Sequence, residues 1–160
     1  MKLKGKRIAA LLLSIIFTLL MGVTAYAAEL PDVNKECSIT FTMLYGGTTP
    51  VSGGSLTIYR VGEIAEDDGN YSFKPTGAFE DCSESFANLG DTALATRLEA
   101  YAQQHSIAGM TKRINAEGIV VFDELPVGLY LVVQQEAASG YEKIAPFLIS
   151  LPYFEDGAYQ

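Results

Sequence analysis

The order of apolar and polar residues along the chain predicts a protein built mostly of short β-strands. Residues 38–43 alternate strictly between polar and apolar side chains, which is typical of a strand with one buried face. Ile39, Phe41 and Met43 share that face. Further strands are expected at 54–61, 71–73, 110–115, 119–122, 129–136 and 144–151, with turn residues between them. About seven such strands predict a mainly β fold, an antiparallel immunoglobulin-like β-sandwich.

One helix interrupts the strands. Leu94, Leu98 and Tyr101 recur at helical spacing, so we predict a helix over about residues 91–104 with Asp91 as its N-cap. His105, the only histidine, follows the last helical turn, where the negative end of the helix favours it. No serine or cysteine with a paired carboxylate can be tied to this histidine, and metal-ligand spacing is absent from the sequence. We therefore do not expect an enzyme.

Residues 1–27 have the pattern of a secretory signal peptide. A basic segment at 2–7 precedes the apolar run 8–21, and the small residues Ala25 and Ala27 precede the expected cleavage point. We expect cleavage before Ala28 and export from the cell. An uncleaved anchor is the alternative, but the apolar run is short for a membrane span.

Removal of residues 1–27 leaves 133 residues, which suffice for one domain. We expect a mobile lead-in over 28–36 and a single domain over 37–160. The remaining chain has seven Lys and Arg residues against nineteen acidic residues, a net charge of −12. A chain this acidic repels nucleic acid and anionic lipid, so neither nucleic acid nor a membrane is an expected partner beyond the signal peptide.

The chain has two cysteines, Cys37 and Cys82. Export to an oxidising exterior permits a disulfide between them, which would stabilise the fold by about 4 kcal/mol. Two separate thiols packed as small apolar side chains are an equally weighted alternative.

The segment from Gly128 to Tyr141 resembles the signature of Cna B-type (SpaA-like, prealbumin-fold) domains of Gram-positive surface proteins and pilins. That signature is G-x-Y-x-L-x-E-x-x-A-P-x-G-Y. Two positions depart from it, because Gln134 stands where the family has Glu and Ala138 stands where it has Pro. The positions that match in register are Gly128, Tyr130, Val132, Ala137, Gly140 and Tyr141. The segments GSLTIYRV, GIVVFDELPVGLYLV and APFLISLP resemble further parts of the N-terminal domain of pilin subunits, so the resemblance covers nearly all of 37–152.

This resemblance implies chemistry that the present residues do not support. In the family, a lysine on the first strand forms an isopeptide bond with an Asn or Asp on the last strand, and a buried Glu moves the protons. Gln134 occupies the position of that Glu, and an amide does not transfer protons near neutral pH. The inward face of the first strand carries no lysine. We therefore expect no internal isopeptide bond and a hydrogen-bonding role for Gln134.

The resemblance implies a structural and adhesive module at the surface of a Gram-positive bacterium, without cofactor or metal. Its expected partners are other surface-protein or pilin subunits. The alternative is an adhesin domain that binds a host protein or glycan through loops 62–70 or 105–118. No wall-sorting signal of the LPxTG type is present in this sequence. Residues 154–160 read as a turn that opens an unfinished strand, which predicts either a fragment of a longer wall protein or an open sheet edge that accepts a partner strand.

Overall fold

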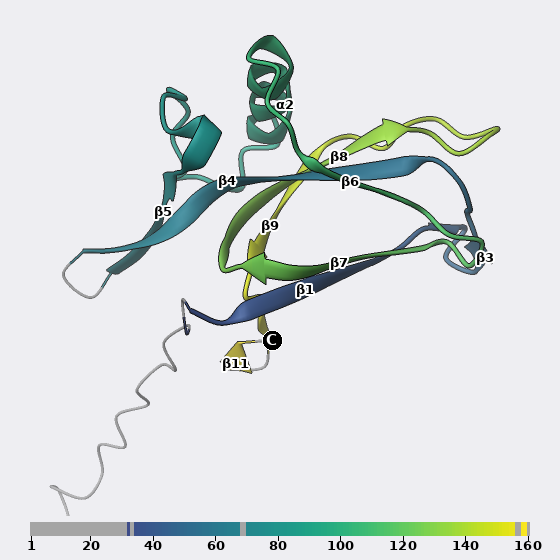
Figure 1. Cartoon of the computed structure of the whole chain (residues 1–160), viewed down its shortest axis with the longest axis horizontal. Helices are drawn as coiled ribbons and strands as arrows, with labels where there is room; N and C mark the ends of the chain where they lie inside the picture. The colour runs from purple at the N-terminus through teal and green to yellow at the C-terminus, as the bar shows by residue number, and fades with distance from the viewer. Residues whose placement is uncertain (1–31, 33, 68–69, 156–157, 160) are drawn as a thin grey trace, which may run out of the picture. The chain divides into compact units, whose positions relative to one another are not determined.

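The computed structural model describes residues 32, 34–67, 70–155 and 158–159 (Figure 1). The expected signal peptide and most of the expected lead-in lie outside these residues. Within them, no helix is long and apolar enough to cross a membrane.

The larger sheet has five antiparallel strands, with β4 and β8 at its centre (Figure 1). Its strands are β4 (Ser55–Asp67), β5 (Asn70–Pro75), β6 (Met110–Arg113), β8 (Gly128–Glu136) and β9 (Phe147–Leu151). The first half of β4 lies between β6 and β8, and its second half pairs with β5. β9 lies on the other side of β8. β4 continues past the predicted residue 61 to Asp67, and this extension forms a hairpin with β5.

The second sheet consists of β1 (Glu36–Thr42) and β7 (Ile119–Pro126), which pair antiparallel with Ile39 opposite Phe122. Two small hairpins were not expected from the sequence. They are formed by β2 (Leu44–Tyr45) with β3 (Thr49–Pro50), and by β10 (Phe154–Glu155) with β11 (Ala158–Tyr159). The two main sheets enclose a shared apolar core, so the predicted antiparallel sandwich with one helix is confirmed.

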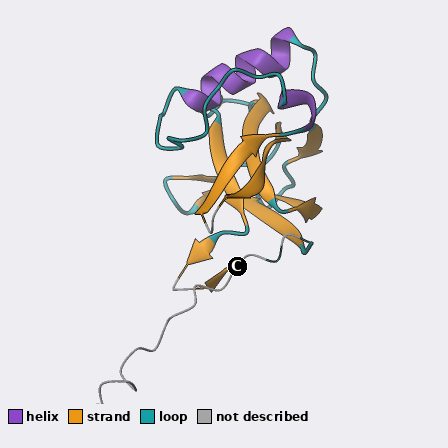
Figure 2. Ribbon diagram, turned by 90° about the vertical axis from the view of Figure 1, so that its left-hand side faces the viewer, coloured by secondary structure: helices purple, strands orange, loops and turns teal. Residues whose placement is uncertain are grey.

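Helix α2 (Leu94–Gln104) and the short 3₁₀ helix η1 (Gly77–Phe79) lie on the same side of the strands (Figure 2). The helix begins three residues later than predicted, and the assignment of Asp91 as its N-cap is wrong. Ala93 occupies the cap position, because residues 91–94 first form a turn in which Leu94 N–H donates to Asp91 O. The Asp91 carboxylate instead accepts from Ala93 N–H at 3.0 Å and pairs with Arg97 at 2.9 Å.

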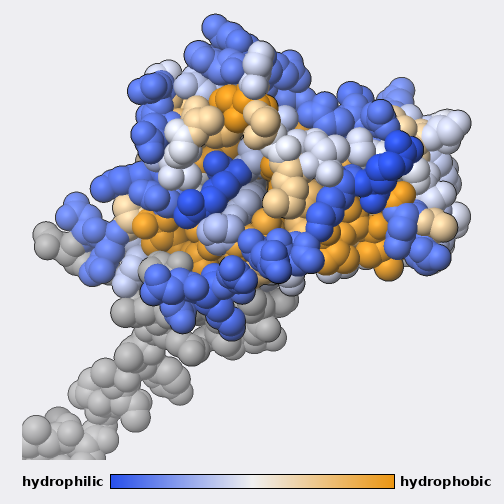
Figure 3. Space-filling model, viewed as in Figure 1, coloured by the Kyte–Doolittle hydropathy of each residue, from blue (hydrophilic) through white to orange (hydrophobic). Residues whose placement is uncertain are grey.

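β8 is buried on both faces, so its sequence is an unbroken apolar run rather than an alternating one. Leu129, Leu131 and Val133 face α2, within the helix-side core. Tyr130 and Val132 face β1 and β7, within the sandwich core. Figure 3 shows hydrophobic side chains reaching the surface between the larger sheet and β7, bordered by hydrophilic ones. The members of the two cores are, on the helix side, Val61, Phe79, Cys82, Phe86, Leu94, Ala95, Leu98, Ala102, Leu129, Leu131 and Val133, and, in the sandwich, Ile39, Leu56, Ile58, Ile114, Val120, Phe122, Leu125, Tyr130, Val132 and Leu151.

Candidate functional site

Gln134 lies in β8 opposite Leu56 of β4 and has an exposed fraction of 5%. The amide N–H of Ile144 donates to its Oε1 at 2.8 Å. This bond fixes the loop before β9 to the strand that precedes it. The structure thus agrees with the expectation of a hydrogen-bonding role for Gln134, because a buried amide needs such a partner.

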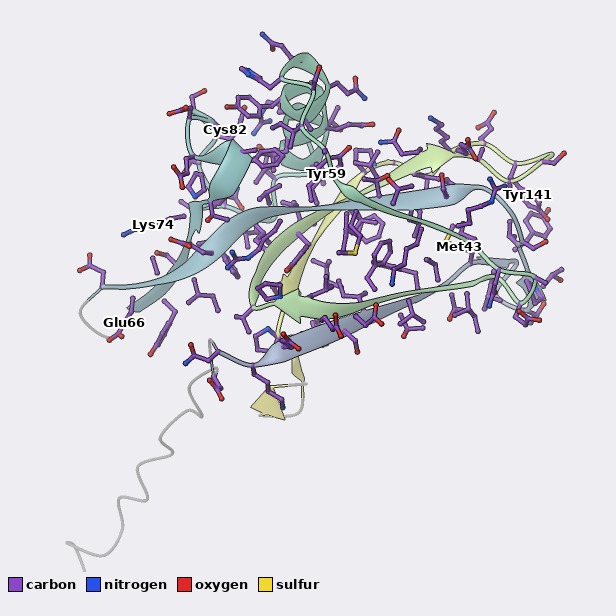
Figure 4. All side chains as sticks on the ribbon, in the orientation of Figure 1. Met43, Tyr59, Glu66, Lys74, Cys82 and Tyr141 are labelled. Carbon is purple, nitrogen blue, oxygen red and sulfur yellow. The ribbon has the colours of Figure 1, made fainter. Side chains whose placement is uncertain are left out.

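Gln134 forms one wall of a pocket of about 110 Å³ at the end of the sandwich. Tyr45 and Tyr141 contact each other edge to face across this end, with ring centroids 5.8 Å apart. Met43 and Tyr141 lie at the same end of the molecule in Figure 4. The pocket is lined by Met43, Leu44, Tyr45, Val51, Gln134, Ala138, Tyr141, Glu142 and Ile144. Glu142 contributes the only carboxylate of this lining, and its side chain is exposed.

No described lysine is buried near this pocket. Met43, which directly follows β1, lines this pocket together with Gln134. Lys74 lies on the β4–β5 ribbon, at the other end of the molecule from Tyr141 (Figure 4). Lys112 forms an ion pair with Asp123 at 2.7 Å, and Lys35 and Lys143 are exposed. No lysine is therefore among the residues that line the pocket beside Gln134.

The two glycines of the signature, Gly128 and Gly140, have different roles in the structure. Gly140 adopts φ +85°, a left-handed conformation that side chains disfavour. A Cβ on Gly128 would lie 2.5 Å from the carbonyl oxygen of Gly62, so that position requires close approach of two backbones. Tyr130 and Val132 of the signature are buried in the sandwich core, while Phe147 and Ile149 of β9 are half-buried.

Tyr130 fixes the turn that precedes β8 by a hydrogen bond. Its hydroxyl donates to the carbonyl oxygen of Pro126 at 2.6 Å, and Arg60 Nη2 donates to the carbonyl oxygen of Val127 at 2.9 Å. Burial raises the pKa of Tyr130 to about 12, and the nearby Arg60 charge offsets part of that effect. Tyr130 is therefore a neutral hydrogen-bond donor at physiological pH and serves the fold rather than proton transfer.

The two cysteines belong to different cores. Cys82 is buried in the helix-side core, and Cys37 packs against the sandwich core, with the larger sheet between these cores. Both are free thiols in the structure. Burial raises the pKa of the Cys37 thiol, and Lys35 offsets part of the rise. This placement favours the alternative of two packed thiols.

Loop 105–118, which the adhesin alternative would use, contributes residues 107–110 to a second pocket of about 280 Å³. Tyr59 and Phe79 also line this pocket. His105 stacks on Tyr101 with ring centroids 4.2 Å apart, at the helix end where it was expected. The described residues contain no group of three His, Cys, Asp or Glu side chains arranged for a metal ion.

Sequence reasoning did not assign Tyr45 and Ile144 to the site. Tyr45 lies beyond the predicted strand 38–43 and enters the β2–β3 hairpin, which was not expected from the sequence. Ile144 was expected within the last strand, which instead begins at Phe147. The backbone N–H of Ile144 is therefore available to Gln134, and no pattern of side chains could have indicated that bond.

Replacing Gln134 with Glu should make stability depend on pH. Burial disfavours a charged carboxylate, so the pKa of the new side chain should lie above the value of about 4.3 in the unfolded chain, even though Ile144 N–H offsets part of this effect. The folded state then binds the proton more tightly. The variant should therefore be most stable below about pH 4 and lose about 3 kcal/mol relative to the parent as the pH rises to about 8.

Urea unfolding of Gln134→Glu and of the parent at both pH values measures this effect. Gln135→Glu is the matched control, because the side chain of Gln135, the next residue in β8, is exposed. The difference in unfolding free energy between this variant and the parent should not grow as the pH rises. A flat pH dependence for Gln134→Glu would mean that position 134 is solvated in solution.

No protein-family model matches the sequence, and no curated protein matches it at a significant level. Among solved structures, the fold is similar to the full-length major pilin SpaD from Corynebacterium diphtheriae, with 22% sequence identity and a TM-score of 0.49 over 81% of this chain and 28% of that pilin. It is also similar to a streptococcal ancillary pilin, with 14% identity and a TM-score of 0.40 over 76% of this chain and 27% of that one. The chain thus spans less than a third of the length of either pilin to which it is similar.

Proposed function

We propose that this chain is a structural module of an exported, pilin-like cell-surface protein of a Gram-positive bacterium, and that it folds without an internal isopeptide bond. The observation that carries the proposal is Gln134. It stands at the position of the family's proton-transferring Glu, is buried, and uses its Oε1 to accept from Ile144 N–H.

The signature segment supports the proposal because its residues form the centre of the fold and the turn that follows it. β8 is a central strand of the larger sheet. It begins at Gly128, and its Tyr130 side chain faces the sandwich core. Gly140 makes the turn that closes the signature. A module of this kind maintains a shape outside the cell and offers surface to neighbouring subunits, and it needs no cofactor.

Packing takes the place of the covalent cross-link in this proposal. The family has a lysine on its first strand and a Glu at the position of Gln134, whereas the inward face of the first strand here carries no lysine. Met43, on that face, and Gln134 line one pocket. A thioether and an amide can pack and bond there without a buried charge. A ligand-binding role is the second proposal, supported by the aromatic side chains of Tyr59 and Phe79 in the pocket next to loop 105–118.

The test is the intact mass of the protein exported by a Gram-positive host that expresses the full 160-residue sequence. We expect a chain that starts at Ala28, with a mass equal to that of its sequence. Alkylation in denaturant without reductant should add two labels, at Cys37 and Cys82. In native buffer Cys82 should react far more slowly, because it is buried.

This measurement tests each part of the proposal by a different result. Retention of the protein inside the cells, or of residues 1–27 on the product, would contradict export by a cleaved signal peptide. A mass lower by one ammonia or one water would show a cross-link and contradict the role given to Gln134. A mass lower by two hydrogens, with no alkylation, would show that the cysteines pair.

A further inference from the structure

The pocket at the end of the sandwich contains a hydrogen-bond donor without a partner. The Gln134 side chain is 5% exposed, and its Oε1 accepts from Ile144 N–H at 2.8 Å. That bond fixes the orientation of the amide, so its Nε2 group, with two N–H donors, is directed away from Ile144 N–H. Among the described residues no acceptor bonds this Nε2, and Arg60 Nε is the sole unpartnered side-chain atom that is fully enclosed. Gln134 Nε2 therefore keeps contact with open space, which the pocket that Gln134 lines provides.

The inner part of this pocket suits a small group that is apolar except for one acceptor. Val51 and Ala138 are buried and line the pocket beside Gln134. Its volume of about 110 Å³ is several times the ~15 Å³ that one water needs. A buried amide donor needs an acceptor, and a ligand that supplies one while packing on apolar walls gains over water.

The mouth of the pocket carries two aromatic rings and a carboxylate. Tyr45 is 65% exposed and Tyr141 is 42% exposed, and their rings meet edge to face. Rings placed in this way offer apolar faces on which the C–H face of a sugar ring can pack while its hydroxyls stay in water. Glu142 is exposed and also lines the pocket. Its carboxylate accepts hydrogen bonds from neutral hydroxyls and repels an anion.

The pocket is formed wholly by described residues. All the side chains that line it lie between residues 43 and 144. One wall is the β2–β3 hairpin with the residues on either side of it, and the other is the end of β8 with the loop before β9. The donor, the apolar walls and the rings are thus all present in this chain.

We propose that this pocket binds the acetamido group of an uncharged N-acetylhexosamine in a glycan. The carbonyl oxygen of that group accepts from Gln134 Nε2, its methyl group packs against Val51 and Ala138, and the sugar ring lies on Tyr45. This site goes beyond the proposed structural role, and it is separate from the pocket next to loop 105–118.

The probe is the β-1,4-linked trimer of N-acetylglucosamine, added to the exported form of the 160-residue chain. We expect saturable binding, with a shift of the Gln134 side-chain amide resonances in the NMR spectrum. Cellotriose is the control, because it has the same ring backbone with hydroxyls in place of acetamido groups. It should bind at least about tenfold more weakly and leave those resonances unchanged.

Variants of the exposed rings test the mouth of the pocket. Tyr45→Ala should weaken binding of the trimer about fivefold, while Tyr45→Phe, which keeps the ring, should leave it unchanged. Tyr71→Ala is the matched control, because Tyr71 is 42% exposed and lies opposite Glu66, at the other end of the molecule from Tyr141 (Figure 4). If Tyr45→Ala does not fold, the Gln134 resonances of the unchanged protein decide the question.

The source of the sugar is tested with a bacterial wall glycan strand, in which every second sugar carries a carboxylate. We expect such a strand to bind at least about fivefold more weakly than the trimer, because its acid groups meet Glu142. Equal binding of the strand and the trimer would overturn the assignment of an uncharged sugar.

Equal binding of the trimer and cellotriose, no saturable binding, or binding without a shift at Gln134 would overturn the proposal. A Gln134 side-chain amide that already exchanges slowly in the free protein would also overturn it, because a polypeptide segment would then fill the pocket. These results do not depend on the intact mass or on export, so a failure of this site is distinguishable from a failure of the proposed function.

Discussion

Replacing Phe122 with alanine should lower the free energy of unfolding by about 3–5 kcal/mol. Phe122 has an exposed fraction of 0% and lies in β7 opposite Ile39 of β1. Its ring meets Phe41 edge to face at 6.2 Å, and Lys112 Nζ lies 5.6 Å from its centroid. The two-stranded sheet is joined to the larger one mainly by such inward side chains, so the cavity would weaken the contact between the layers.

Urea unfolding measures this loss, and Val121→Ala is the matched control. Val121 is adjacent in β7, but its side chain points outward and is 42% exposed. Its truncation should cost less than about 1 kcal/mol. Similar losses for the two variants would mean that Phe122 is not at the centre of the sandwich core in solution.

Replacing Gly54 with alanine should cost about 3 kcal/mol. Gly54 adopts φ +75°, which is unfavourable for alanine. A Cβ there would also press into the Glu136 carbonyl oxygen and lie 2.9 Å from Ala138 N, and both are backbone atoms that cannot rotate away. The end of β8 would have to shift, and Gln134 lies on the same strand.

Gly47→Ala separates the two causes of that loss. Gly47 has nearly the same φ, +77°, but nothing lies within 4 Å of a Cβ built on it. Its thermal unfolding should show only the backbone cost of about 1 kcal/mol. If both variants lost the same amount, the close approach of Gly54 to β8 would not exist in solution.

The sequence predicted the elements whose periodicity is set by burial. The alternation of residues 38–43 indicated β1, and the apolar run of 129–136 indicated β8, which is buried on both faces. The spacing of the signature also drew attention to Gln134, which is buried and hydrogen-bonded in the structure. Helix α2 was predicted from the spacing of Leu94 and Leu98, which pack in the helix-side core.

Features that depend on contacts between segments far apart in the chain could not be predicted from the sequence. The bond from Ile144 N–H to Gln134 depends on where β9 begins, and no propensity sets that boundary. The start of α2 at Leu94 depends on a turn that Asp91 forms with its own neighbours. The separation of Cys37 from Cys82 follows from which face of the larger sheet each segment covers, and two positions in a sequence do not specify a face.

The double-sided burial of β8 makes the two layers mechanically interdependent. Leu131 and Val132 are neighbours in the chain, but each belongs to a different core. A fluctuation that detaches α2 from the sheet exposes one face of β8 to water. The other face of β8 belongs to the sandwich core, so the loss of packing on one side also weakens the other. Neither layer can therefore open far while the other stays intact, and the domain yields as one cooperative unit when it is pulled or heated.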